Sequence, residues 1–306
     1  PDYIAELKTS LAPEETLVIA ISKSGETVTQ IEALLQFQEF PMLFITGAAG
    51  PLADLAEHFS AKHIMHPPIG GRYTGLTEVA LIPAALCGLD VKAMYKAAKQ
   101  QYEKFSSTNE ASRAASVMYQ LEEQGIVDVF VPIYDAHLYG MNNLIIQLCH
   151  ESFGKDGKGQ TYFAHHAPES QHHTNQRFFG GRKNIAGWFL STDAPLQDLT
   201  TTVPDGAKKI TLKDHTLDAH DSISLSAALE AELHGNLENA KLENIPVVNQ
   251  SISKRNAEEV GNLIAFWQLY AVYSSVLRGV DPFNQPQVEN SKKISFAKRL
   301  QQKGLL

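Results

Sequence analysis

A short turn rich in hydroxyl side chains has the composition of an anion-binding site. It follows an apolar run at residues 16–21 that is typical of a buried strand, and apolar residues at helical spacing come after it. Free backbone N–H groups, hydroxyls and the positive end of a helix converge where a strand turns into a helix, which suits a phosphate. The alternative is that Ser24 is only a helix N-cap. The polar residues of the turn are Ser22, Lys23, Ser24 and Thr27.

This turn lacks the glycine pattern of a Walker loop and of a dinucleotide fingerprint, so no nucleotide site is predicted from it. A second candidate is Arg72, which ends a loop rich in proline and glycine where the backbone can approach a ligand. A third is the pair Gln147 and Glu151, which are four residues apart and therefore share one face of a predicted helix. An ion pair between Glu151 and Lys155 is the structural alternative for this carboxylate.

Three further polar side chains occur late in the chain. His172 lies on a predicted helix that Pro168 opens. Gln285 and Lys292 are two helical turns apart, although the basic run around Lys292 is also typical of a solvated helix face. A metal site is an alternative for the histidines, but their spacing fits no common zinc motif. The residues concerned are His150, Glu151, His165, His166, Glu169, His172 and His173.

Alternating strands and helices must position these side chains. The alternation predicts an α/β fold with two doubly wound parallel sheets and a helical C-terminal segment, in which ligands bind at the carboxyl ends of the strands. Gly125 marks the predicted boundary between one domain at residues 1–124 and another at residues 125–306. Strands are predicted at residues 16–21, 41–46, 61–66, 126–134, 161–164, 183–191 and 245–252.

Composition narrows the classes of function. The 306 residues carry a formal net charge of −8, which argues against nucleic acid as the main partner. No apolar run of membrane-spanning length and no secretory signal are recognised, so we expect a cytoplasmic protein without a membrane partner. Cys87 and Cys149 lie in apolar helical surroundings, and we expect both to be buried free thiols.

Four motifs in this order resemble the phosphoglucose isomerase family, also called the glucose-6-phosphate isomerase family. Residues 21–27 resemble its Ser-Lys-Ser/Thr phosphate turn, and residues 70–73 resemble the start of its Gly-Gly-Arg helix. Residues 151–155, followed by Gln171-His172, resemble its central segment. Residues 282–292 resemble its C-terminal signature with the Gln-to-Lys spacing intact, which is the most specific match. The resemblance covers nearly the whole chain.

The resemblance implies sugar-isomerase-type domains and interconversion of glucose 6-phosphate and fructose 6-phosphate without a metal or organic cofactor. It implies that Glu151 moves a proton between C1 and C2, and that Arg72 stabilises the cis-enediol(ate). His172 and Lys292 match the residues that open the sugar ring. Such chemistry needs a carboxylate close to the carbon acid and a permanent cation beside the enediolate oxygens. The implied substrate-binding residues are Ser22, Lys23, Ser24, Thr27, Gln147 and Gln285.

The resemblance also implies a homodimer in which the histidine of one subunit completes the active site of the other. The family has a Gly-Gly-Ser loop upstream of the phosphate turn, and this chain, which starts at Pro1, has none. We therefore expect the first domain to be incomplete at its N-terminus. Two alternatives stay open. One is a sugar-phosphate-binding protein without catalysis, which would not need Glu151 as a base. The other is an isomerase that also accepts mannose 6-phosphate.

Overall fold

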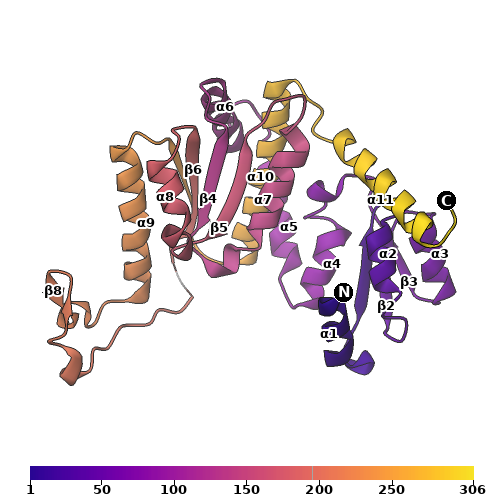
Figure 1. Cartoon of the computed structure of the whole chain (residues 1–306), viewed down its shortest axis with the longest axis horizontal. Helices are drawn as coiled ribbons and strands as arrows, with labels where there is room; N and C mark the ends of the chain where they lie inside the picture. Colours follow the sequence, from indigo (N-terminus) through magenta and orange to yellow (C-terminus); the bar gives the residue numbers. More distant parts are fainter. Residues whose placement is uncertain (195) are drawn as a thin grey trace. The chain divides into compact units, whose positions relative to one another are not determined.

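The computed structural model describes residues 1–194 and 196–306, which group into two compact units. The first unit consists of Pro1–Gln100 and Phe283–Leu306, and the second of Gln101–Pro282. Both are built on parallel sheets, and the predicted α/β class with a helical C-terminal segment is confirmed (Figure 1).

The bounds of the units differ from the predicted division at residues 124 and 125. Helix α6 (Glu110–Glu123) packs along α10 (Ala257–Arg278) in the second unit, although it precedes the predicted boundary. The last residues of the chain, from Phe283, belong to the first unit. Local sequence signals such as Gly125 mark the ends of helices, whereas the units are set by long-range packing.

The first unit contains a three-stranded parallel sheet in the order β1-β2-β3. Ser22, the last residue of β1, is level with Thr46 of β2, and Thr46 is level with Met65 of β3. The carboxyl ends of all three strands therefore form one even edge. The strands are β1 (Val18–Ser22), β2 (Met42–Thr46) and β3 (Lys62–Met65). The helices are α1 (Asp2–Ser10), α2 (Val28–Leu34), α3 (Pro51–His58), α4 (Glu78–Leu86) and α11 (Glu289–Gln302), and α5 (Val91–Glu103) leads into the second unit.

The second unit contains a four-stranded parallel sheet in the order β5-β4-β6-β9. Every residue from Ile185 to Ser191 of β6 is buried, as expected for a central strand of a parallel sheet covered on both faces. The strands are β4 (Asp128–Ile133), β5 (Thr161–His166), β6 (Ile185–Thr192) and β9 (Val247–Ile252). The remaining helices are α7 (Met141–Phe153), α8 (Thr174–Gly180) and α9 (Leu225–Leu242). A small antiparallel hairpin joins β7 (Thr211–Leu212) to β8 (His215–Thr216).

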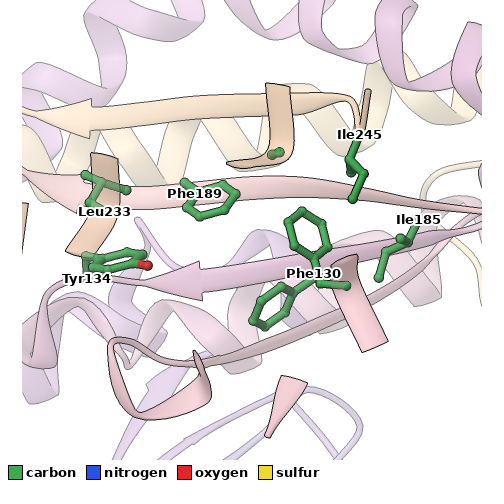
Figure 2. Packing of buried hydrophobic residues seen from close by; sticks show 8 residues of the cluster. Phe130, Tyr134, Ile185, Phe189, Leu233 and Ile245 are labelled. Carbon is green, nitrogen blue, oxygen red and sulfur yellow. The ribbon is translucent and has the colours of Figure 1, made fainter. Parts of the chain in front are cut away.

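Successive residues of β6 serve opposite faces of this sheet. On one face Phe189 and Ile185 lie with Phe130 of β4 in a cluster that α8 and α9 complete (Figure 2). On the other face the ring of Trp188 lies 4.5 Å from Trp267 and 5.1 Å from Tyr270, both on α10. The alternation of side chains along a strand thus gives the sheet two apolar layers, each covered by helices.

Helix α10 has the length and apolar composition that would allow a helix to cross a membrane, and it is the one such helix in residues 1–194 and 196–306. Its most apolar window is 56% buried within the protein. Trp267 and Tyr270 are fully buried against the sheet. The helix is therefore the core helix of the second unit.

Three local expectations need correction. The sequence predicts a helix at residues 74–87 after the loop of Arg72, but helix α4 begins at Glu78, because Thr77 accepts a hydrogen bond from the N–H of Val79 and caps it. The helix expected from Pro168 is instead a 3-10 turn at Glu169–His172, followed by the separate helix α8. Cys149 is buried as predicted, but Cys87 is exposed, since it follows α4, a helix without a fully buried residue.

The close packing of β6 predicts opposite effects for the same substitution at two glycines. A Cβ atom at Gly187 would lie 2.7 Å from the ring of Phe189 and 2.9 Å from that of Phe178. Gly187→Ala should lower the free energy of unfolding by about 1–3 kcal/mol. Gly235 lies on the exposed side of α9, and a Cβ there would have no atom within 4 Å. Gly235→Ala should therefore raise the free energy of unfolding by up to about 1 kcal/mol. Urea unfolding of both variants measures the two effects, and a neutral Gly187→Ala variant would contradict the packing of β6.

Candidate active site

The hydroxyl-rich turn lies at the carboxyl edge of the first sheet. The hydroxyl of Ser22 is 3.0 Å from that of Thr27, which closes the turn on itself. The N–H of Glu26 donates to Oγ of Ser24 at 3.2 Å, while Lys23 is exposed. Helix α2 starts after Thr27, so Ser24 caps the turn and is not the N-cap of the helix. The turn therefore keeps the form of a compact polar cradle at a strand end.

The turn is fitted closely to the neighbouring strand β2. Gly25 has a positive φ of 67°, and a Cβ there would lie 3.1 Å from both Leu52 Cβ and Thr46 Oγ1. The hydroxyl of Thr46 is buried and has no hydrogen-bond partner within the part of the chain that the structure describes. Thr46 is not among the polar residues predicted for this turn. It could have been recognised as the last residue of a predicted strand, which is level with Ser22.

Arg72 belongs to a 3-10 turn that follows β3, and it is 2% exposed. Its Nη1 donates to Oε1 of Gln285 at 2.9 Å, and its Nη2 donates to the carbonyl oxygen of Asn284 at 3.1 Å. Its guanidinium carbon lies 5.4 Å from the centre of the Tyr73 ring. The structure thus brings together two motif residues that are 213 positions apart in the sequence. Both lie in the first unit.

Gln285 and Lys292 do not share a helix, contrary to the spacing argument. Gln285 precedes a 3-10 turn at Pro286–Val288, whereas Lys292 lies in the first turns of α11. Lys292 is exposed and donates to Oε1 of Glu289 at 2.8 Å. Further along α11, Arg299 forms a two-pronged ion pair with Glu32 of α2, with distances of 2.6 and 3.0 Å. The ion pair joins α11 to the helix that follows the hydroxyl-rich turn.

Glu151 and Gln147 share one face of α7 in the second unit, as predicted. Nε2 of Gln147 lies 3.5 Å from Oε1 of Glu151, at the long end of hydrogen-bond distances. The neighbouring His150 accepts a hydrogen bond from the N–H of Tyr162 at 2.9 Å, and burial lowers the pKa of His150. This bond ties the last turn of α7 to the start of β5. Lys155, the alternative partner considered for Glu151, donates to the carbonyl oxygen of Asp281.

His172 is exposed at the end of the 3-10 turn that follows β5. The preceding residue, Gln171, donates to the hydroxyl of Tyr134 at 2.8 Å. Burial raises the pKa of Tyr134 to about 12, so this phenol stays protonated at neutral pH. Tyr134 directly follows β4, and its bond to Gln171 therefore holds the turn with His172 at the carboxyl edge of the second sheet.

Glu151 and His172 consequently lie at opposite edges of the second sheet. Helix α7 runs back from the carboxyl end of β4, and its last turn meets the start of β5. His172 comes after the far end of β5, a strand of six residues, and such a strand spans roughly 20 Å. The fold of one chain therefore does not bring the two side chains together.

The alternative metal site is not assembled. Rings of His165 and His173 lie 5.3 Å apart, and His173 is 3.9 Å from Glu169. Within residues 1–194 and 196–306, however, no group of three or more histidine, cysteine, aspartate or glutamate side chains is arranged to hold a metal ion.

Curated relatives cover almost the whole chain, although no family model matches it. A probable glucose-6-phosphate isomerase from Methanococcus maripaludis is 29% identical over 316 residues, which are 96% of this chain and 68% of the relative. The glucose-6-phosphate isomerase of Staphylococcus saprophyticus is 29% identical over 317 residues, covering 96% of this chain and 69% of the relative. The chain thus spans little more than two thirds of the length of these relatives.

Solved structures show the same fold. A hypothetical protein from Thermus thermophilus matches with a TM-score of 0.88 and 25% identity over 98% of this chain and 75% of its own. A glucose-6-phosphate isomerase from Chlamydia trachomatis matches with a TM-score of 0.77 and 19% identity over 97% of this chain and 62% of its own. The chain is thus similar over nearly its whole length to glucose-6-phosphate isomerases, in agreement with the four motifs, and the solved structures show that it shares their fold.

Proposed function

We propose that this protein interconverts glucose 6-phosphate and fructose 6-phosphate through a cis-enediol(ate) intermediate. The observation that carries the proposal is the buried guanidinium of Arg72, which Gln285 and Asn284 hold and whose loop leaves the carboxyl edge of a parallel sheet after β3. Ligands of such sheets bind at this edge. A fixed, permanently charged guanidinium is suited to stabilise the negative charge that develops on enediolate oxygens.

The phosphate group would bind at the turn of Ser22, Lys23, Ser24 and Thr27, which lies at the carboxyl edge from which the loop of Arg72 leaves after β3. Neighbouring strands are about 4.8 Å apart, so the ends of β1 and β3 lie roughly 10 Å apart across β2. This distance is suited to a phosphosugar whose phosphate lies at one end and whose reacting carbons lie at the other. The phosphate does not react, and its binding orients the carbons that do.

In this proposal Glu151 is the base that moves the proton between C1 and C2, with Gln147 contacting the substrate. A carboxylate at the end of a helix whose last turn is tied to β5 has the fixed position that proton transfer requires. Lys292 and His172 would assist opening of the sugar ring. Gln285 would contact both the substrate and Arg72. The reaction needs no metal or organic cofactor, because each proton transfer has a side chain assigned to it.

We further propose a homodimer with shared active sites. Because Glu151 and His172 of one chain lie at opposite edges of the second sheet, His172 would complete the site of the other subunit. The exposure of His172 supports this role, since a side chain that serves a partner must reach outward. We expect the protein to act in the cytoplasm, with sugar phosphates as its ligands and without nucleic-acid or membrane partners.

Replacing the proposed base separates catalysis from binding. Glu151→Gln should lower kcat by about 10²–10⁴-fold, because the amide cannot accept the proton, while the affinity for sugar phosphate is retained. Turnover should be measured with glucose, fructose and mannose 6-phosphates, and binding by calorimetry. Glu238→Gln on the exposed face of α9 serves as the control. Equal turnover in wild type and Glu151→Gln would leave a non-catalytic binding protein as the better assignment, and turnover of mannose 6-phosphate would establish the broader isomerase.

Sharing of the active site can be tested by mixing two inactive variants. Glu151→Gln and His172→Ala subunits refolded together in equal amounts should regain about a quarter of wild-type activity, because half of the dimers are mixed and each has one intact site. The same subunits kept apart should stay inactive. If mixing restores nothing although mixed dimers form, the histidine acts within its own chain or not at all.

Arg72 offers a test of the guanidinium itself. Arg72→Lys keeps the positive charge but removes the planar fork that reaches Gln285 and Asn284, so kcat should fall by about 10²–10³-fold. Arg113→Lys is the matched control, since Arg113 donates to a carbonyl oxygen from an exposed position on α6. Unchanged turnover in Arg72→Lys, with unfolding still cooperative, would remove Arg72 from the mechanism.

A further inference from the structure

The glycine-rich loop after Glu151 has two lysines with partners at the end of α10. Nζ of Lys158 donates to the carbonyl oxygen of Arg278 at 2.7 Å. Nζ of Lys155, a residue that is 7% exposed, donates to the carbonyl oxygen of Asp281, just beyond the helix. Lysines favour the carbonyl oxygens at the end of a helix, where backbone acceptors lack partners and the helix dipole is negative. Each ammonium group thus has a backbone acceptor at or just beyond the end of α10.

The same loop folds back onto the last turn of α7. A Cβ atom at Gly159 would lie 2.7 Å from the carbonyl oxygen of Phe153 and 2.8 Å from Cα of Gly154. A Cβ at Gly154 would lie 2.6 Å from the carbonyl oxygen of His150. Only glycines allow this approach of backbone to backbone. The loop is consequently in direct contact with the helical turn that carries Glu151.

A buried ion pair holds the far side of this arrangement. Glu122 accepts from Nε of Arg278 at 2.8 Å and from the N–H of Gly159 at 2.7 Å, so it joins α6, α10 and the loop. The guanidinium carbon of Arg278 lies 4.6 Å from the centre of the Phe153 ring, and both side chains are buried. Buried ion pairs often add little net stability. We therefore interpret this pair of Glu122 and Arg278 as a means of positioning the loop.

We propose that Lys155 and Lys158 are positioning residues for the base Glu151, acting by fastening the loop at residues 154–159 to the end of α10. The proposal rests on the proposed isomerase function for its kinetic consequences. The ammonium groups do not touch the substrate in this role. They fix the loop, the loop fixes the last turn of α7, and this turn fixes the carboxylate. A base displaced by about 1 Å can lose up to about 10²-fold in rate.

The test compares Lys155→Met and Lys158→Met, singly and together, with wild type. Methionine keeps much of the apolar stem and removes the charged donor. Lys183→Met is the matched control, because Lys183 also donates to a carbonyl oxygen near a helix end, that of Phe179 at 2.9 Å, in the same unit. In the double variant kcat should fall about 10-fold or more with KM changed less than about twofold. The kinetics of the control should match those of wild type.

Hydrogen exchange gives a second measurement that needs no catalysis. Amides of residues 150–159 should exchange about tenfold faster in the double variant, with other parts of the second unit unchanged, since local opening sets these rates. A higher KM with unchanged kcat would make the lysines phosphate ligands and overturn the proposal, as would unchanged exchange. If wild type itself shows no isomerase activity, the proposed function fails, and the exchange rates alone decide whether the lysines hold this turn.

Discussion

Parallel pairing of the strands is the constraint on which the rest of this structure depends. Each parallel strand must be followed by a crossover that returns the chain to the opposite edge of the sheet. Segments that directly follow strands therefore meet at the carboxyl edge, while the ends of the returning helices meet at the amino edge. In the first unit the hydroxyl-rich turn directly follows β1, and the loop that carries Arg72 leaves the same edge after β3.

The same constraint separates two residues in the second unit that the proposed chemistry needs together. Glu151 ends a crossover helix and lies at the amino edge, whereas His172 follows a strand and lies at the carboxyl edge. The length of the strands keeps the amino and carboxyl edges of this sheet apart. The proposed homodimer would resolve the conflict, because the second copy would supply the missing side chain without any change in the sheet.

Two buried guanidinium groups each join distant parts of their own unit. Arg278 has Glu122 as a charged partner and packs on Phe153, so it joins α10 to α6 in the second unit. Arg72 donates to the oxygens of Gln285 and Asn284, so it joins the turn after β3 to the last residues of the chain in the first unit. Because a guanidinium is rigid and planar, acceptors on two of its donors set the direction of the whole group.

The regular elements could be predicted from the sequence because their information is local. Apolar runs marked β1, β2, β4 and β6 close to their observed ends, and helical spacing placed Gln147 beside Glu151. The turn at residues 22–27 was also recognisable, since a strand, small hydroxyl residues and a helix follow one another. The predicted helix ends that were wrong depended on a few hydrogen bonds. One example is the cap by Thr77, with which α4 starts later in the sequence than predicted.

The sequence by itself determined the fold class, the family resemblance and the types of side chain available for chemistry. Only the tertiary structure decided that the last residues return to the first unit, so that Gln285 meets Arg72 across 213 positions. Only it decided that Lys155 and Lys158 bind the end of α10, and that Cys87 is exposed while Cys149 is buried. The physical reason is that periodicity reports which face of an element is buried, whereas the partner on that face is chosen by packing between distant parts of the chain.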